Sequence, residues 1–428
     1  MPHVNAKVTA VAATALGMSA AATALPRKWE GVDSALERMV LRACLDQAPE
    51  RRRVREAFKD MQLNIDHCLF KTLVPTKDTT RRKEDTTKRK PRRTSTTALH
   101  KTLVPTKDTT RRKEDTTKRK PRRTSTTALH KAQYNDIRTT ESYELNSRGV
   151  EIFSKCWFPE NRRMKAIVCL CHGYGDTCTF FLDGIARNIA AAGYGVFALD
   201  YPGFGLSEGL HGYIPSFDTL VDDVAETFAK VKGNPDYRGI PSFLFGQSMG
   251  GAVALKIHFK QPDEWNGAIL VAPMCKISDD VVPAWPVQQV LIFLAKLLPK
   301  EKLVPQKDLA ELAFKEEEKR EQTSYNVIAY KDKPRLRTAL EMLRTTQEIE
   351  SRLEEVSLPI IILHGDADLV TDPAVSKDLY EKAKTSDKTL RLYKDAYHSI
   401  LEGEPDEAIF QVLDDITSWL DQHSAKEV

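Results

Sequence analysis

The sequence predicts an α/β fold in which a mostly parallel central sheet is covered by helices on both faces. From about residue 142 onwards, short apolar segments alternate with helix-like segments, which is typical of chains that form parallel sheets. Polar or glycine-rich turns follow several apolar segments, where such sheets place their functional sites. The alternation breaks between residues 276 and 346, and we interpret this insertion as a helical cap that precedes a later core strand.

An N-terminal arm, residues 1–70, precedes this core. Its first 29 residues contain no acid and are rich in alanine, which resembles a plastid transit peptide. A secretory signal ending near Ala24 and an uncleaved disordered start are the alternatives. Residues 32–70 have the spacing of one amphipathic helix, with apolar side chains on a single face.

Cysteine usage bears on the compartment. The chain has seven cysteines without paired spacing, which favours reduced thiols over a disulfide framework. We therefore expect an intracellular protein, in the plastid if the arm is a transit peptide. A cytoplasmic or peripheral membrane location is the alternative.

Residues 71–130 are a thirty-residue segment that is repeated without a change. Each copy has ten Lys or Arg and three Asp or Glu, so the two copies together have a net charge of +14. The whole chain has a net charge of +4, so the rest of the chain has a net charge of −10. With almost no apolar residues, the segment cannot form a core, and we expect a disordered linker. The alternative is an arm that binds polyanions weakly, either nucleic acid or anionic lipid.

The most informative segment is 246–250, which has the pattern G-x-S-x-G. It follows an apolar segment at 242–245 and precedes a helix-like segment at 251–258. Strand, sharp turn and helix in this order are the nucleophile elbow of an α/β-hydrolase, whose glycines give room to a strained central residue. We expect Ser248 to be the nucleophile, with the Met249 N–H pointing at the same site.

A catalytic serine needs a base and an orienting acid, which follow it in the chain in this fold. The apolar segment 358–363 predicts a buried strand, and the loop behind it holds three carboxylates. These carboxylates belong to Asp366, Asp368 and Asp372. The segment 389–393 predicts another strand, and His398 follows it. His398 is therefore the candidate base.

The oxyanion hole needs a second backbone donor, from the loop after an earlier strand. Residues 165–171 predict that strand, and the loop at 172–176 contains two glycines. We expect the Tyr174 N–H to pair with the Met249 N–H. We interpret His172 and His364, each in a His-Gly turn after a strand, as structural turn residues. No Cys/His cluster has zinc spacing, and serine acyl chemistry needs no metal or cofactor.

The cap, residues 276–346, contains the apolar stretch 281–299, whose three prolines and Lys296 make it a poor membrane span. We expect it to roof the site and to bind an acyl chain or an aromatic acyl group. We expect a substrate pocket lined by Trp285, Phe293 and Leu294, and peripheral contact of the cap with a membrane. Ordinary cap core is the alternative interpretation.

From about residue 142 to 423 the chain resembles the plant monoacylglycerol lipase and caffeoylshikimate esterase group, also described as lysophospholipase-like. The matching motifs lie at residues 146–153, 172–177, 200–205, 246–251, 272–276, 364–368 and 395–398. The resemblance implies an α/β-hydrolase fold, and we assign its core to residues 131–275 and 347–428. It places the triad on Ser248, Asp368 and His398, which selects Asp368 among the three carboxylates. It places the oxyanion donors on Tyr174 and Met249.

The resemblance also implies an activity, the hydrolysis of carboxylic esters through an acyl-enzyme. The expected substrates are monoacylglycerols or similar single-acyl lipids, with caffeoyl shikimate and lysophospholipids as alternatives. Some members are said to carry an H-x4-D acyltransferase motif, whose spacing His258 and Asp263 fit, but they lie away from the strand ends. A polyanion-binding or interaction protein on a hydrolase scaffold is the alternative from a different class.

Overall fold

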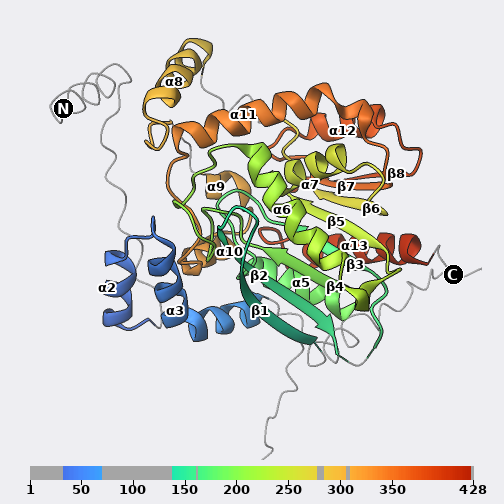
Figure 1. Cartoon of the computed structure of the whole chain (residues 1–428), viewed down its shortest axis with the longest axis horizontal. Helices are drawn as coiled ribbons and strands as arrows, with labels where there is room; N and C mark the ends of the chain where they lie inside the picture. Colours follow the sequence, from blue (N-terminus) through green and yellow to red (C-terminus); the bar gives the residue numbers. More distant parts are fainter. Residues whose placement is uncertain (1–31, 70–136, 161, 277–283, 305–308, 426–428) are drawn as a thin grey trace, which may run out of the picture.

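The computed structural model describes residues 32–69, 137–160, 162–276, 284–304 and 309–425 (Figure 1). The predictions for residues 1–29 and for the duplicated segment 71–130 lie outside the described residues.

An eight-stranded sheet in the order β1-β2-β4-β3-β5-β6-β7-β8 forms the centre of the molecule. Strand β2 pairs antiparallel with β1 and β4, and all other neighbours are parallel, so the predicted mostly parallel sheet is confirmed. The central strands are continuous apolar runs because helices bury them on both faces. The strands are β1 Ile137–Leu145, β2 Glu151–Pro159, β3 Ile167–Cys171, β4 Gly195–Leu199, β5 Ser242–Gln247, β6 Gly267–Val271, β7 Ile360–Gly365 and β8 Lys388–Tyr393.

Helices cover the two faces of this sheet. On one face α5 and α13 contact each other and the strands, and on the other face lie α6, α7 and α12. Each face has its own buried apolar cluster, and the two clusters meet the strands from opposite sides. These helices are α5 Phe181–Ala191, α6 Phe217–Lys232, α7 Met249–Lys260, α12 Pro373–Lys382 and α13 Asp406–Ser424.

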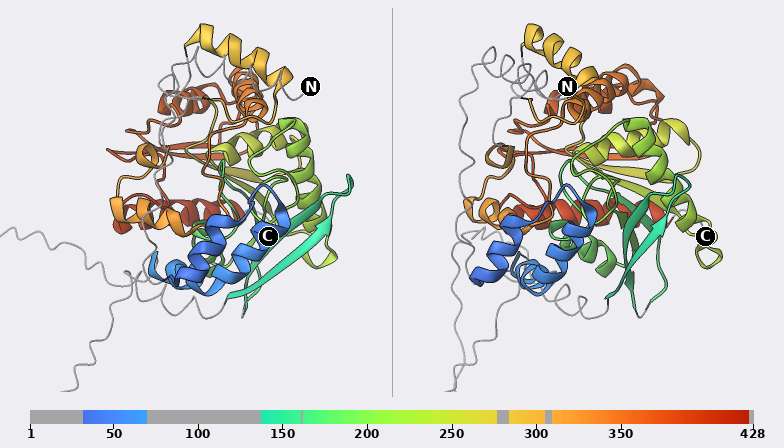
Figure 2. Two further views of the ribbon diagram at one scale, coloured as in Figure 1. Left: turned by 90° about the vertical axis from the view of Figure 1, so that its left-hand side faces the viewer. Right: turned by 60° about the vertical axis from the view of Figure 1, so that its left-hand side comes forward.

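The N-terminal arm contains two helices where the sequence predicted one. Helix α2 spans Ser34–Arg42 and α3 spans Ala48–Leu69. Pro49 explains the break, because a proline lacks the N–H and clashes with the preceding turn of a continuous helix. Both helices pack on the α/β body beside β1 (Figure 2), and Val54 and Phe58 of α3 join the buried cluster of the α5 face.

Arg51 of α3 fastens the pair to the core. Its side chain is completely buried, and its guanidinium donates to the carbonyl oxygens of Leu45, Gly205 and Ser207. Asp46, in the turn between α2 and α3, pairs with Arg335 of the cap at 2.6 Å. The two helices therefore bridge the core and the cap.

The cap contains α8 Trp285–Leu297, α9 Leu309–Ala313, α10 Glu317–Gln322 and the start of α11 Leu336–Ser351. Helix α8 packs on α11, which in turn contacts α6 and α7 of the core. The predicted cap boundary at residue 346 thus falls inside α11. Among the described residues no helix is both long and apolar enough to span a bilayer.

Candidate active site

The predicted elbow is a sharp turn between β5 and α7. Ser248 has φ 53° and ψ −121°, a backbone conformation that residues other than glycine rarely adopt. A Cβ on Gly246 would lie 2.4 Å from the Gly250 carbonyl oxygen, and a Cβ on Gly250 would lie 2.0 Å from the Cys171 carbonyl oxygen. Both glycines are therefore required by contacts of backbone with backbone.

The structure brings Ser248, His398 and Asp368 together. The Ser248 Oγ is 3.0 Å from His398 Nε2, and His398 Nδ1 is 2.6 Å from Asp368 Oδ2. A carboxylate only accepts, so the proton lies on Nδ1 and leaves Nε2 free to accept from the serine. This is the order of groups that activates a serine nucleophile.

Asp368 is buried and accepts five hydrogen bonds. Its Oδ1 accepts from the Val370 and Thr371 N–H groups, at 2.7 and 3.1 Å. Its Oδ2 accepts from both histidines and from the Thr371 hydroxyl, the latter at 2.9 Å. Burial alone would raise the pKa of Asp368, but the charge of His398 and the bonds from His364 and His398 outweigh burial and lower it. The acid is therefore held ionised.

The pKa of His398 moves in the opposite direction. Burial lowers the pKa of a histidine, but the nearby Asp368 carboxylate outweighs burial and raises the pKa of His398 above its ordinary value of 6.5. Glu402 adds to this effect. His398 is thus a stronger base than a free histidine.

The other two carboxylates of the loop have different partners. Asp372 caps α12 and accepts from the Ala374 N–H at 2.8 Å. Asp366 accepts from the Asp395 N–H at 2.6 Å. Among the three carboxylates of this loop, Asp368 is therefore the one that contacts His398, and its role as the acid stays a prediction.

The predicted oxyanion loop faces the serine, since a Cβ on Gly173 would lie 3.5 Å from the Ser248 Cβ. Within the part of the chain that the structure describes, neither the Tyr174 N–H nor the Met249 N–H donates to another residue. The cap holds this loop, because the Tyr330 N–H donates to the Gly175 carbonyl oxygen at 2.7 Å. Two free donors beside the nucleophile suit a developing oxyanion, and their role stays a prediction.

The remaining histidines differ in their surroundings. His172 is buried against the Tyr201 ring, with 3.8 Å between ring centroids, and burial lowers its pKa to about 4. His258 accepts from the Ser357 N–H at 3.1 Å. The contacts of His172 and His258 are with residues outside the Ser248, His398 and Asp368 series. His364, which the sequence assigned to a turn, instead donates to Asp368 at 2.9 Å.

Glu402 is a further neighbour that the sequence did not single out. It is buried, and its Oε1 accepts from the Gln247 Nε2 of the elbow at 2.7 Å. Burial raises its pKa. No motif or periodicity marks this residue in the sequence.

The predicted pocket residues of α8 require a correction. Trp285 and Phe293 are 69% and 61% exposed, and Leu294, at 7%, packs in a cluster with α11. Apolar residues on two sides of one helix cannot all face one site, so these three do not form a common pocket wall.

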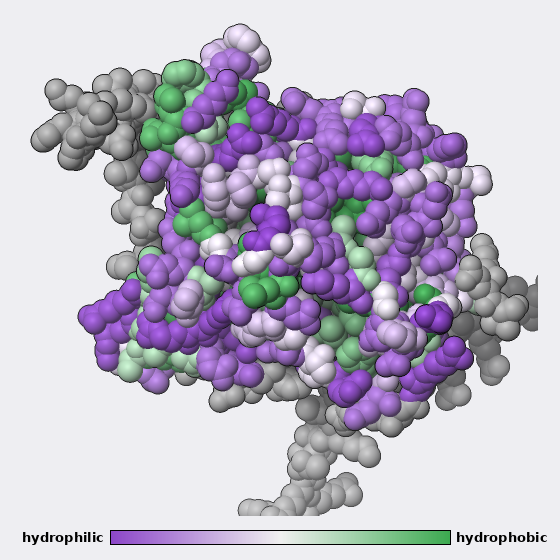
Figure 3. All heavy atoms as spheres, viewed as in Figure 1, coloured by the Kyte–Doolittle hydropathy of each residue, from purple (hydrophilic) through white to green (hydrophobic). Residues whose placement is uncertain are grey.

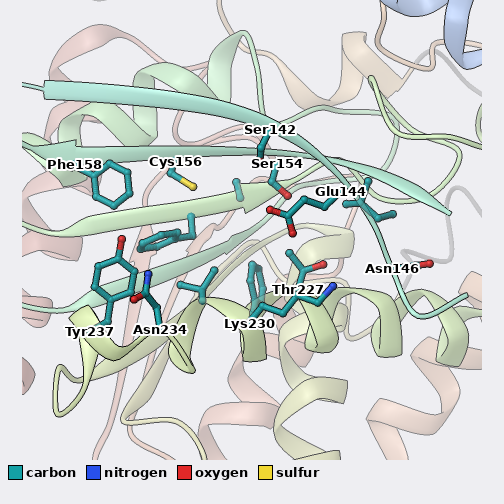
Figure 4. A pocket seen from close by; sticks show the side chains of 15 residues that line it. Ser142, Glu144, Asn146, Ser154, Cys156, Phe158, Thr227, Lys230, Asn234 and Tyr237 are labelled. Atoms are coloured by element: carbon teal, nitrogen blue, oxygen red, sulfur yellow. The ribbon is translucent and has the colours of Figure 1, made fainter. Parts of the chain in front are cut away.

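A cavity of about 240 Å³ lies between the outer strands and α6 (Figure 4). Ser142, Ser154 and Cys156 line it from β1 and β2, and Thr227 and Lys230 line it from α6. None of the predicted site residues lines this cavity, so it is separate from the catalytic groups. No group of three or more His, Cys, Asp or Glu side chains suited to a metal occurs among the described residues.

Comparison with known proteins identifies the family from a family model and from curated relatives. The family model described as "Serine aminopeptidase, S33" matches residues 162–406. The chain is 34% identical over 291 residues to caffeoylshikimate esterase from Arabidopsis thaliana, covering 68% of this chain and 87% of that protein. It is 29% identical over 283 residues to monoglyceride lipase from Homo sapiens, covering 66% of this chain and 90% of that protein.

Among solved structures, a soluble variant of monoglyceride lipase from Saccharomyces cerevisiae superposes with a TM-score of 0.59 at 23% identity, covering 67% of this chain and 95% of that one. This likeness shows the fold. The fold, the matched family model and the identity to the Arabidopsis relative agree, and the chain therefore belongs to the serine aminopeptidase S33 family of α/β-hydrolases.

Proposed function

We propose that this protein is a serine carboxylester hydrolase that cleaves monoacylglycerols or similar single-acyl lipid esters. The observation that carries the proposal is the hydrogen-bonded series Ser248, His398 and Asp368 on a strained elbow. The relatives named monoglyceride lipase support the substrate class.

The hydrogen-bonded order of these groups supports the following reaction. His398 Nε2 takes the Ser248 proton as Oγ attacks the ester carbonyl, and the Tyr174 and Met249 N–H groups bind the oxyanion. Asp368 stabilises the imidazolium, which then protonates the leaving alcohol. Water, deprotonated by His398, attacks the acyl-enzyme and releases the acid, which restores Ser248.

Caffeoyl shikimate is a second candidate substrate, favoured by the 34% identity to the Arabidopsis caffeoylshikimate esterase. The experiment is a comparison of kcat/KM for monoacylglycerols of different chain lengths, a lysophospholipid and caffeoyl shikimate. We expect the highest value for a monoacylglycerol. A clear preference for caffeoyl shikimate would replace the lipid assignment while leaving the catalytic assignment intact.

We further propose that α8 is the membrane-facing part of the cap. Four of its apolar residues are exposed, and Figure 3 shows apolar surface gathered over this helix. They are Trp285 at 69%, Val290 at 49%, Phe293 at 61% and Leu297 at 61%. Val290, Phe293 and Leu297 have the i, i+3 and i+7 spacing of one helix face. An exposed apolar face on a helix suits insertion into the lipid interface.

Vesicle binding tests this proposal. Replacing Phe293 and Leu297 with Ser should reduce cosedimentation with phosphatidylcholine vesicles and raise KM for vesicle-borne substrate, without an effect on a soluble short ester. Leu41→Ser, which removes an exposed apolar side chain from α2, is the control and should bind as wild type. Equal binding by all three proteins would refute the role of α8.

A further inference from the structure

His364 lies at the end of β7 and is completely buried. Its Nε2 is 2.9 Å from Asp368 Oδ2, and its Nδ1 is 2.7 Å from the hydroxyl oxygen of Ser376 in the first turns of α12. Both ring nitrogens are therefore occupied, one by the acid and one by the next helix. The catalytic series thus extends behind Asp368 by two residues.

We propose that His364 is a positioning residue of the active site, which directs the Asp368 carboxylate at His398 through its Nε2–H and is itself held by Ser376. The inference rests on the proposed function, because it assumes that Asp368 is the catalytic acid. His364 is not one of the three groups that carry out the proposed reaction, and its role is to orient one of them.

The placement of His364 explains how a loop residue is held in one orientation. Asp368 lies in the turn between β7 and α12, where the Val370 and Thr371 N–H groups hold its Oδ1 from within the turn itself. His364 belongs to the strand before the turn and Ser376 to the helix after it, so the ring connects both fixed elements to the carboxylate. Thr371 adds a third donor to the same oxygen.

His364 also tunes the acid. Asp368 Oδ2 accepts from His364 and from His398, so the two N–H groups share one oxygen. A donor from His364 withdraws negative charge from that oxygen and limits the attraction of Asp368 for the His398 proton. The groups that face His398 are Asp368, Glu402 and the hydroxyls of Ser248 and Thr371, with His364 behind Asp368. Loss of the His364 donor should leave His398 more basic.

The test compares His364→Asn with His364→Gln. The glutamine amide reaches the position of the ring Nε2 and can still donate to Asp368, whereas the shorter asparagine amide reaches only the position of Nδ1, beside Ser376. We expect H364N to move the acidic limb of the kcat/KM profile upward by about 0.5–1 pH unit, because one hydrogen bond to a charged group is lost. H364Q should keep the wild-type limb.

His258→Asn is the matched control. It also removes a buried histidine, one that contacts Ser357 at the far end of α7, and should leave the limb unchanged even if it lowers stability. Rates of fluorophosphonate labelling against pH provide a second readout that needs only the folded fraction of each variant. A purely structural role of His364 would alter stability without moving the limb.

The outcomes separate the two proposals. If H364N and H364Q have the same acidic limb, the positioning role is wrong although the enzyme remains a serine hydrolase. If Ser248→Ala is still labelled, the proposed function itself fails. A shift confined to H364N, with no labelling of Ser248→Ala, supports both.

Discussion

Replacing Arg51 with Met tests whether the α2–α3 pair is a structural part of the enzyme. The methionine keeps most of the apolar stem but removes the guanidinium, which donates to the Leu45, Gly205 and Ser207 carbonyl oxygens. These acceptors are backbone carbonyl oxygens. They lose the Arg51 donor, and the methionine side chain has no donor to replace it. The guanidinium also lies near the buried Asp200. Burial lowers the pKa of Arg51 to about 10, so the guanidinium is still charged at neutral pH.

The expected cost follows from these contacts. An orphaned buried acceptor costs about 1–3 kcal/mol, and removing one partner of a buried charged network costs about 3–5 kcal/mol. Relief from burying the guanidinium offsets part of the loss, so we expect a net destabilisation of about 3–4 kcal/mol. At about 2 °C per kcal/mol for a domain of this size, the Tm should fall by about 6–8 °C.

Thermal unfolding followed by circular dichroism measures this change. Arg53→Met is the matched control, because Arg53 lies on the same helix but is exposed and pairs with Glu50. It should leave the Tm within about 1 °C of wild type, as expected of a surface pair. If Arg51→Met is as stable as Arg53→Met, the helix pair is not fastened to the core as we infer.

Three further predictions concern the site. Asp368→Asn should lower kcat about 10⁴-fold, because the amide favours the wrong tautomer of His398. Asp372→Asn should keep kcat within about twofold of wild type, because Asn also caps a helix. Steady-state kinetics of both variants decide between these two residues. The pKa of His398 is raised above 6.5, and the protonated imidazole cannot take the serine proton, so kcat/KM of the wild type should fall as the pH drops through a midpoint above 6.5; a midpoint below 6.5 would contradict the assignment of the base. Gly250→Ala should destabilise the protein by at least about 2 kcal/mol in chemical unfolding, because its Cβ would lie 2.0 Å from the Cys171 carbonyl oxygen; a stable, fully active variant would contradict the elbow geometry.

The core strands and the turn at Ser248 could be predicted because short sequence patterns identify them. Apolar runs identify buried strands, and Gly246 is required by a contact with the nearby Gly250, whereas Gly250 is required by the Cys171 carbonyl oxygen of the neighbouring strand β3. The choice of Asp368 among three carboxylates came from the resemblance. The residues alone left it open, because which side chain reaches His398 depends on how the loop folds.

The unpredicted features depend on tertiary contacts. Arg51 is one of several arginines in a basic helix, and nothing in its spacing indicates that it is the buried one. The apolar stretch of α8 predicted contact with an apolar partner but not whether Phe293 faces the protein or the solvent. His364 was assigned to a His-Gly turn, and its contact with Asp368 depends on how the loop after β7 folds.

The role of Ser248 as the nucleophile is tested most directly by Ser248→Ala, assayed for monoacylglycerol hydrolysis and for covalent labelling by a fluorophosphonate. We expect labelling to disappear and kcat to fall by about four to six orders of magnitude, while the circular dichroism spectrum and the Tm stay close to wild type. Turnover within tenfold of wild type, or continued labelling at another residue, would contradict the claim that Ser248 is the nucleophile.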